Sequence, residues 1–279
     1  MKTASPTLAP STRVAFVGGG NMASAIIGGL IGRGLPARQI QVIEPLPEAR
    51  EQLRQRHGVA AQEAASAALA GIDVLVWAVK PQSFQAAAAP LAAHAGAALH
   101  LSVMAGIRAE AIAAAARSPR VVRCMPNTPA LIGQGMTGLY AAPAATGADR
   151  ALAEGVIAAT GDWLWVEREE LLDAVTALSG SGPAYVFFFL QAMQQAGAEL
   201  GLTGEQSRRL AVATFLGGAA LARDSAEPLA TLRERVTSKG GTTHAALSAM
   251  REAGIDAAFI TAMKAAARRA KELGDEFGG

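Results

Sequence analysis

The first part of the chain alternates short apolar runs with longer stretches in which apolar residues recur at helical spacing. Residues 74–79 form a continuous apolar run between Asp73 and Lys80, as expected for a strand buried on both faces. Similar runs predict strands at 13–17, 40–43, 99–103 and 121–125, and shorter ones near 136–140 and 163–166. Helices are predicted between them, at 21–34, 47–57, 63–70, 82–94, 108–116 and 149–160. This alternation predicts an α/β fold with a Rossmann-type, doubly wound parallel sheet.

Beyond residue 168 the pattern is helical only. Helices are predicted at 169–178, 183–200, 204–223, 229–236, 243–252 and 256–274. The 183–200 helix is apolar around most of its circumference, so it needs burial on several sides, and we expect a second subunit to supply part of it. The predicted organisation is a flexible tail at 1–12, a dinucleotide-binding domain at 13–168 and an all-α domain at 169–279.

Composition excludes several classes of protein. The chain has 279 residues, enough for two domains, and a formal net charge of +2 without a basic block, which disfavours nucleic-acid binding. Residues 81–107 lack charged side chains, but their prolines, glutamines and histidines disfavour a membrane span. Residues 1–12 lack the apolar core of a signal peptide. One cysteine, Cys124, and four histidines without ligand spacing predict no disulfide and no metal site. We expect a cytoplasmic protein.

A glycine-rich turn follows the first predicted strand. Gly18, Gly20 and Ala23 fit the G-x-G-x-x-[G/A] pattern, in which glycines allow a tight turn and a close approach of a pyrophosphate to the backbone. A packing turn without a ligand is the alternative. Lys80, at another predicted strand end, can offer a charge to the phosphates or ribose, or it can be an ordinary solvated lysine.

Glu44 follows the second predicted strand, where an acidic residue hydrogen-bonds the ribose hydroxyls of NAD. Its charge repels a 2′-phosphate and so favours NADH, whereas Arg50 or Arg54 can reach such a phosphate. The choice between NADH and NADPH therefore stays open, as does a reading of Glu44 as a solvated strand end.

A second glycine-rich segment, VTSKGGTTHAAL at 236–247, precedes a predicted helix. Backbone N–H groups and hydroxyls at such a helix start can bind a small anion. One chain thus contains a candidate site for a dinucleotide and another for a small carboxylate, which together favour a dehydrogenase or reductase.

Six segments resemble landmarks of the pyrroline-5-carboxylate reductase family. They are FVGGGNMASAI (16–26), AVKPQ (78–82), SVMAGI (102–107), RCMPNTPA (123–130), ALSGSGPAYVF (177–187) and VTSKGGTTHAAL (236–247). The resemblance covers residues 13–272. It implies NADPH- or NADH-dependent reduction of 1-pyrroline-5-carboxylate to L-proline, a helical substrate and dimerisation domain, and homodimers that can assemble further, for example into a decamer.

The resemblance also implies roles for individual residues. Contacts to NAD(P)H are implied for Val17, Gly18, Gly19, Gly20, Asn21, Met22, Ala78, Val79, Lys80 and Pro81. Contacts to the substrate are implied for Ser238, Gly240, Gly241, Thr242 and Thr243. Thr243 is implied to approach the imine nitrogen, with Thr176 close to the same pocket. Asn127, held between Pro126 and Pro129, is the best polar candidate for the nicotinamide end of the site, with a purely structural role as the alternative.

Two positions depart from the family pattern. Lys239 stands where family members usually have proline, so the loop loses a fixed φ and gains a charge. Ala65 lies near the position where many members have an asparagine that reaches the cofactor ribose. The second departure again leaves the choice of cofactor open.

The implied reaction does not require a strong acid from the protein. A cyclic imine is basic enough to accept hydride as an iminium already protonated by solvent, so the protein has to orient the reactants and exclude water. A β-hydroxyacid dehydrogenase is one alternative, but it usually needs a lysine donor, and the helical part offers only Lys239, Lys264 and Lys271. A non-catalytic dinucleotide-binding or regulatory protein is the other, and it has no need of the 236–247 segment.

Overall fold

The computed structural model describes residues 6–91 and 93–277. Within these residues the strands form one eight-stranded sheet with the order β3-β2-β1-β4-β5-β6-β7-β8. The strands are β1 (Val14–Val17), β2 (Ile40–Ile43), β3 (Ala61–Gln62), β4 (Val74–Trp77), β5 (Leu99–Ser102), β6 (Val121–Met125), β7 (Gly135–Ala141) and β8 (Gly161–Trp165). Neighbouring strands are parallel except β6 and β7, which are antiparallel. The predicted Rossmann-type doubly wound sheet is confirmed.

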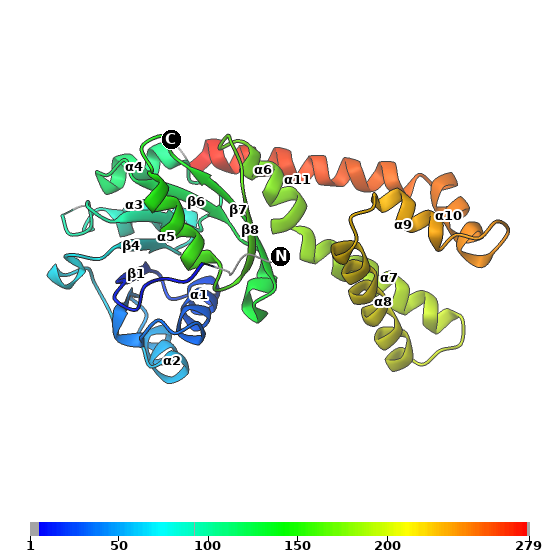
Figure 1. Cartoon of the computed structure of the whole chain (residues 1–279), viewed down its shortest axis with the longest axis horizontal. Coiled ribbons are helices and arrows are strands. Elements are labelled where there is room, and N and C mark those ends of the chain that lie inside the picture. Colours follow the sequence, from blue (N-terminus) through cyan, green and yellow to red (C-terminus); the bar gives the residue numbers. More distant parts are fainter. Residues whose placement is uncertain (1–5, 92, 278–279) are drawn as a thin grey trace. The chain divides into compact units, whose positions relative to one another are not determined.

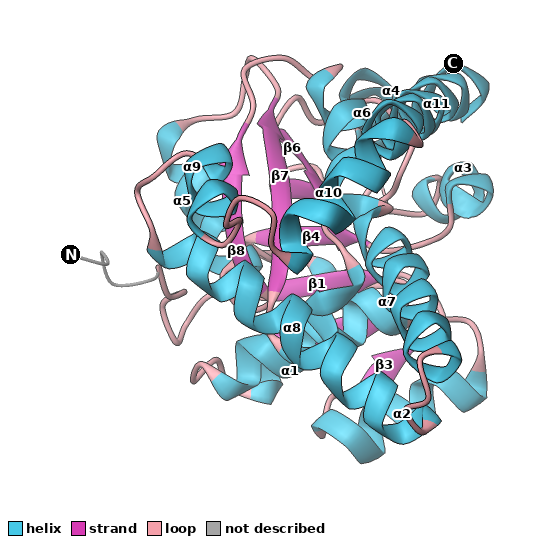
Figure 2. Ribbon diagram, turned by 90° about the vertical axis from the view of Figure 1, so that its right-hand side faces the viewer, coloured by secondary structure: helices cyan, strands magenta, loops and turns pink. Residues whose placement is uncertain are grey.

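The strands are apolar at consecutive positions because both faces of the sheet are covered. Val14 and Phe16 of β1 belong to one buried cluster, whereas Ala15 and Val17 belong to the other. The first cluster includes apolar residues of α1 (Asn21–Gly32) and α5 (Gly147–Ile157), and the second those of α3 (Phe84–Ala88) and α4 (Ala109–Ala116). Figure 2 shows these two pairs of helices on opposite sides of the sheet. A continuous apolar run is thus the result of period-2 alternation between two cores.

Two predicted helices are wrong in extent. The predicted helix at 63–70 is only one 3₁₀ turn, Ala67–Leu69, which the Ser66 side chain caps, and β3 precedes it. The predicted helix at 82–94 contains a 3₁₀ turn, Pro81–Ser83, and the short α3. Alanine-rich composition favours helix in both places. A helix does not continue past Gly71, which has a positive φ, and Pro90 interrupts the second segment. Residue 92 of the second prediction lies outside the described residues.

The chain divides into two compact units. Unit 1 holds the chain up to Ser181 together with the chain from Ala266 onward, and unit 2 holds Gly182–Ala265. Unit 1 also contains α2 (Pro47–His57) and α6 (Leu171–Val175), followed by a π-helical turn, Thr176–Gly180. Unit 2 is helical, with α7 (Gly182–Glu199), α8 (Gly204–Asp224), α9 (Leu229–Arg235), α10 (Thr242–Glu252) and the first part of α11 (Ile255–Phe277), as labelled in Figure 1.

The last turns of α11 return to unit 1. Phe277 packs against the second core cluster, and the Gly106 backbone lies so close to Leu273 that a Cβ on Gly106 would be 3.2 Å from the Leu273 carbonyl oxygen. Near the other terminus, Leu8 packs against Gly155, and the Pro6 carbonyl accepts a hydrogen bond from Arg33. The first five residues of the predicted tail lie outside the described residues, and the predicted domain bounds 1–12, 13–168 and 169–279 stay a prediction.

No helix in the described part of the chain is both long enough and apolar enough to cross a membrane.

A buried histidine lies between β4 and β5. Trp77 Nε1 donates to His100 Nδ1 at 3.1 Å, so Nδ1 must be unprotonated, and Nε2 faces the Ala95 carbonyl oxygen at 3.2 Å. Burial lowers the pKa of His100 to about 4. The unfolded chain binds this proton more readily, because an exposed histidine has a pKa of roughly 6.5. His100 therefore contributes stability above about pH 6.5 that is lost as the pH falls towards 4.

We predict that His100→Gln makes the protein less sensitive to acid. Between about pH 7 and pH 4.5, the free energy of unfolding of the wild type should fall by roughly 2 kcal/mol more than that of the variant. In this pH range the unfolded wild type takes up a proton at His100 that the folded protein does not bind, and the variant has no such group. Urea unfolding at one protein concentration measures both values. Equal losses in the two proteins would contradict a buried, neutral His100.

Candidate functional site

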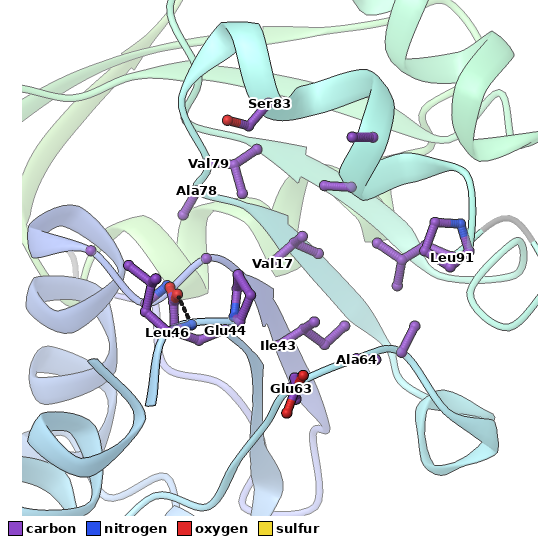
Figure 3. Close-up of a pocket in the computed structure, with 18 of the residues that line it drawn as sticks. Val17, Ile43, Glu44, Leu46, Glu63, Ala64, Ala78, Val79, Ser83 and Leu91 are labelled. Atoms are coloured by element: carbon purple, nitrogen blue, oxygen red, sulfur yellow. Dashed lines mark hydrogen bonds between the residues drawn. The ribbon is translucent and has the colours of Figure 1, made fainter. Parts of the chain in front are cut away.

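A pocket of about 630 Å³ lies at the carboxyl ends of β1, β2 and β4. Carboxyl ends of parallel strands meet at one edge of a sheet, and ligands of doubly wound proteins bind there. Figure 3 shows Ile43, Glu44 and Glu63 along one wall, with Val79 and Ser83 opposite. Every residue that lines the pocket belongs to unit 1.

The turn between β1 and α1 requires glycine at its first position. Gly18 has a φ of +94°, and a Cβ there would lie 2.6 Å from the Ala78 carbonyl oxygen. Two backbone hydrogen bonds hold the turn between its neighbouring strands, from Gly18 N to the Ile43 oxygen at 2.8 Å and from Ala78 N to the Val17 oxygen at 2.9 Å. A side chain at Gly18 would be strained and would collide with the backbone.

Gly20 meets a different requirement. It has an extended conformation at the N-cap of α1, and a Cβ there would have no atom within 4 Å. No side chain among the described residues caps this helix end. The first N–H groups of α1 therefore lack partners within the helix and face a position that a glycine leaves open, which fits a pyrophosphate.

Glu44 connects the glycine turn to the end of β2. It is 8% exposed, and its Oε2 accepts a hydrogen bond from Gly19 N at 2.8 Å while Oε1 accepts one from Leu46 N at 3.0 Å. A carboxylate has capacity for about four hydrogen bonds, so the two backbone donors leave room for ribose hydroxyls. Glu44 is thus a structural support of the turn as well as a charge in the pocket. The alternative interpretation of Glu44 as a solvated residue at a strand end is excluded.

The remaining walls are mostly apolar. They are formed by Ile43, Pro45, Leu46, Ala64, Ala65, Ala86, Ala87, Pro90 and Leu91, together with Glu63 and Ser83. Among the described lining residues, Lys80 is the only cation. An apolar slot beside an uncapped helix start and two carboxylates fits the adenosine and pyrophosphate of a dinucleotide.

The structure brings most of the predicted cofactor residues together. Those that line the pocket are Val17, Gly18, Gly19, Gly20, Glu44, Ala78, Val79 and Lys80. Asn21, Met22 and Pro81 adjoin the pocket in the chain without lining it, and Asn127 is not among the lining residues. Sequence reasoning missed Glu63, Ala64, Ser83 and the apolar wall, because they come from loops and short turns without a motif. Glu63 is placed beside Glu44 by the parallel pairing of β2 with the two-residue strand β3, and a strand this short gives no signal in the sequence.

The Asn127 amide is already used within unit 1. Its Oδ1 accepts from Met136 N at 2.9 Å, and its Nδ2 donates to Ser179 Oγ at 3.1 Å. Asn127 thereby fastens the start of β7 to the π-helical turn 176–180. These contacts favour the structural alternative for Asn127, and its contact with the cofactor stays a prediction.

The same π-helical turn contains Thr176. Its hydroxyl donates to the Leu172 carbonyl oxygen at 2.7 Å. Gly180 allows the turn to pack closely, because a Cβ there would lie 2.6 Å from Met125 Cε. Single π-helical turns are frequent at functional sites, and this one is held by Asn127 on one side and Met125 on the other.

The segment 236–247 forms a tight turn between α9 and α10 in unit 2. Gly240 has a φ of +75°, and Gly241 N donates to the Ser238 carbonyl oxygen at 3.0 Å. A Cβ on Gly241 would lie 2.5 Å from Ser238 Oγ, so a side chain here would make the Ser238 hydroxyl rotate away. Gly241 is the N-cap of α10 and no side chain in the described residues caps it. Ser238, Gly241, Thr242 and Thr243 thus surround an open helix start, while Lys239 is exposed.

In the part of the chain that the structure describes, no three histidine, cysteine, aspartate or glutamate side chains are grouped as a metal site. Cys124 is buried, and burial raises the pKa of its thiol well above the usual range, so it is a core residue.

Sequence and structure comparisons agree with this geometry. Residues 169–273 match the family model described as pyrroline-5-carboxylate reductase dimerisation, and residues 13–106 match the model described as NADP oxidoreductase, coenzyme F420-dependent. A pyrroline-5-carboxylate reductase from Pseudomonas aeruginosa is 44% identical, covering 95% of this chain and 98% of the relative. One from Haemophilus influenzae is 40% identical over 93% of this chain and 97% of its own length.

A solved structure is similar over the same extent. The pyrroline-5-carboxylate reductase of Coxiella burnetii has a TM-score of 0.88 and 34% identity, covering 94% of this chain and 98% of that protein. The sheet, the glycine turn and the helical unit therefore define an oxidoreductase that uses NAD(P)H. The chain belongs to the pyrroline-5-carboxylate reductase family. The resemblance seen in the six sequence segments is confirmed.

We predict that Gly20→Ala weakens cofactor binding without unfolding the protein. The added methyl group meets no protein atom, but it occupies the position at which a pyrophosphate approaches the backbone. The Kd for NADH, measured by calorimetry, should rise at least about tenfold, while thermal unfolding changes little.

Gly32→Ala is the matched control. Gly32 is exposed near the other end of α1, and a Cβ there also meets no atom within 4 Å. This variant should bind NADH like the wild type. A Gly20→Ala protein with unchanged affinity would show that the pyrophosphate does not approach Gly20.

Proposed function

We propose that this chain reduces 1-pyrroline-5-carboxylate to L-proline, the last step of proline biosynthesis. The observation that carries the proposal is the presence, in one chain of this family, of two open helix starts with different chemistry. One follows the glycine turn at Gly18–Gly20 and faces a dinucleotide-sized pocket. The other follows Gly240 and Gly241 and is surrounded by hydroxyl groups.

The cofactor is held by the pocket of unit 1. Backbone groups of Val17, Gly18, Gly19, Gly20, Asn21 and Met22 take the pyrophosphate at the start of α1. Ala78, Val79, Lys80 and Pro81 form the side at the end of β4, where Lys80 supplies a positive charge. Glu44 holds the turn through Gly19 and faces the ribose. When bound, the reduced nicotinamide supplies a hydride to the imine carbon.

The substrate carboxylate is bound by the start of α10. The N–H groups of Thr242 and Thr243 lie in the first turn of α10, where the helix offers them no acceptor, and with the Ser238 hydroxyl and the exposed backbone of Gly240 they give donors suited to one small anion. Gly241 shapes this site, because its N–H donates to the Ser238 carbonyl oxygen. Lys239 adds a solvent-exposed positive charge beside this turn. The usual proline would instead fix the backbone here, so in this chain the positive φ of Gly240 and the Gly241–Ser238 hydrogen bond have to shape the turn.

The proton comes to the ring nitrogen without a strong protein acid. A cyclic imine is protonated by solvent, and the Thr243 hydroxyl then orients the iminium nitrogen as a hydrogen-bond acceptor. Thr176 contributes a second hydroxyl, and its hydrogen bond to the Leu172 carbonyl leaves the oxygen lone pairs available. Orientation and exclusion of water are then the main contributions of the protein.

The functional form is a homodimer that can assemble into a larger oligomer such as a decamer. Support comes from unit 2, where Phe187, Phe188, Leu216 and Leu221 are each more than 60% exposed on α7 and α8. An apolar surface of this extent is typical of a covered interface. The proposed location is the cytoplasm, where reduced nicotinamide cofactor is supplied and where the single cysteine stays a thiol.

The reaction is tested by mixing the purified protein with 1-pyrroline-5-carboxylate and following the loss of reduced-nicotinamide absorbance. We expect oxidation that depends on the imine, with proline as the product. A folded protein that oxidises neither NADH nor NADPH in the presence of the imine would contradict the proposed function.

We predict that Thr243→Ala lowers kcat/KM for the imine by about 10- to 100-fold, the loss expected for one hydrogen bond to a charged group. The Kd for the cofactor should stay the same. Ser248→Ala on the same helix α10 is the control and should retain full activity. Unchanged kinetics in the Thr243 variant would remove Thr243 from the site.

We predict that light scattering of the purified protein gives a mass at least twice the 28.4 kDa of one chain. A tenfold mass would identify the decamer. A single-chain mass at about micromolar concentration would contradict the assembly, because the apolar face of α7 and α8 would then stay exposed to water.

A further inference from the structure

Two acidic residues adjoin each other at one end of the dinucleotide pocket. Strands β2 and β3 are parallel, with Ile43 opposite Gln62, and Glu44 N donates to the Gln62 carbonyl oxygen at 2.8 Å. The next residues along each strand, Glu44 and Glu63, therefore both follow the carboxyl edge. Both line the pocket, and Figure 3 shows them along the same wall beside Ile43.

The nearby arginine is already engaged. Arg50 Nη1 donates to the Glu44 carbonyl oxygen at 2.9 Å and to the Pro45 carbonyl oxygen at 2.8 Å, and Nη2 lies 3.7 Å from Glu63 Oε2. The Arg50 side chain is 23% exposed, so it lies largely beneath the loop that follows β2. Arg54 makes two hydrogen bonds to Glu51 and is not among the pocket-lining residues. Neither arginine presents a free guanidinium to the pocket.

The two carboxylates have different functions. The Glu44 oxygens accept backbone hydrogen bonds from Gly19 and Leu46, so Glu44 is part of the framework that every dinucleotide would need. The Glu63 side chain is 77% exposed, and its only polar contact with other described residues is the long one to Arg50. An ion pair this exposed contributes little to stability, so Glu63 can be changed without disturbing the turn.

We propose that Glu63, through its own charge and its hold on Arg50, makes this chain select NADH over NADPH. The inference rests on the proposed function, in which the pocket binds the cofactor. An acidic residue at the end of the second strand accepts hydrogen bonds from ribose hydroxyls, whereas a 2′-phosphate needs a nearby arginine. A phosphate monoester carries almost two negative charges. Beside Glu44 and Glu63, with Arg50 engaged, a 2′-phosphate is repelled and NADH is not.

The test is calorimetric titration of the full chain, without imine, with NADH and with NADPH. We expect the wild type to bind NADH at least about tenfold more tightly, as expected for a doubly charged group close to two carboxylates. Adenosine 2′-phosphate and adenosine 5′-phosphate, used as competitors, should show the same order. Equal affinities, or tighter binding of NADPH, would overturn the proposal.

Glu63→Gln isolates the residue responsible. It removes one negative charge and leaves Arg50 Nη2 without its acidic partner, while Nη1 keeps its bonds to the Glu44 and Pro45 carbonyl oxygens. The Kd for NADPH should therefore fall roughly tenfold while that for NADH changes less than about twofold. Glu110→Gln, an exposed position on α4 outside the pocket lining, controls for net charge and should alter neither Kd. Adding Arg50→Gln to Glu63→Gln should cancel the gain for NADPH. Equal shifts for both cofactors in Glu63→Gln would contradict its role.

Failure of the inference and of the proposed function give different results. Binding of neither cofactor would reject the pocket assignment and the inference with it. Binding of both cofactors, without their oxidation when the imine is added, would reject the proposed reaction. The two Kd values would still show whether the chain binds NADH more tightly than NADPH.

Discussion

The parallel pairing of β1 with both β2 and β4 is the constraint on which the nucleotide-binding unit depends. It brings three strand ends to one edge, where Gly18 bonds to Ile43 and where Ala78 approaches too closely to allow a side chain at Gly18. The Glu44 carboxylate then fixes the next residue of the turn through Gly19. The pocket is therefore a product of strand register, and the Glu44 carboxylate supports the backbone before it can serve a ligand.

Much of the fold follows from residue patterns. Apolar runs such as Val74–Trp77 mark strands because both sheet faces are buried, and the wholly helical pattern beyond residue 168 agrees with the helical unit 2. The two-residue strand β3 has no pattern of its own and forms only because β2 offers an edge. The alanine-rich segments 63–70 and 82–94 favour helix locally, yet the structure uses them as pocket walls, where tertiary contacts outweigh propensity.

The candidate site was predictable to the same degree. Motif and position identify glycines and strand-end charges such as Gly18, Glu44 and Lys80, and all three line the pocket. Glu63 and Ser83 do not, because loops that the sheet brings together have no common spacing in the sequence. Asn127 shows the opposite difficulty: a polar residue between prolines is typical of a binding site, but its amide bonds to Met136 and Ser179. Sequence identifies a polar group without saying whether the protein has already used it.

The return of α11 to unit 1 affects how this protein can be divided. Its last turns supply Phe277 to one core cluster, and Gly274 has a Cβ position only 2.6 Å from Arg108 Nη2. The nucleotide-binding unit is thus discontinuous in the gene. A fragment that stops at Ser181 would leave part of its own interior uncovered, even though it contains the whole sheet and the glycine turn. Exchange of the helical unit between relatives, by recombination or by design, therefore requires two crossovers, one on each side of Gly182–Ala265.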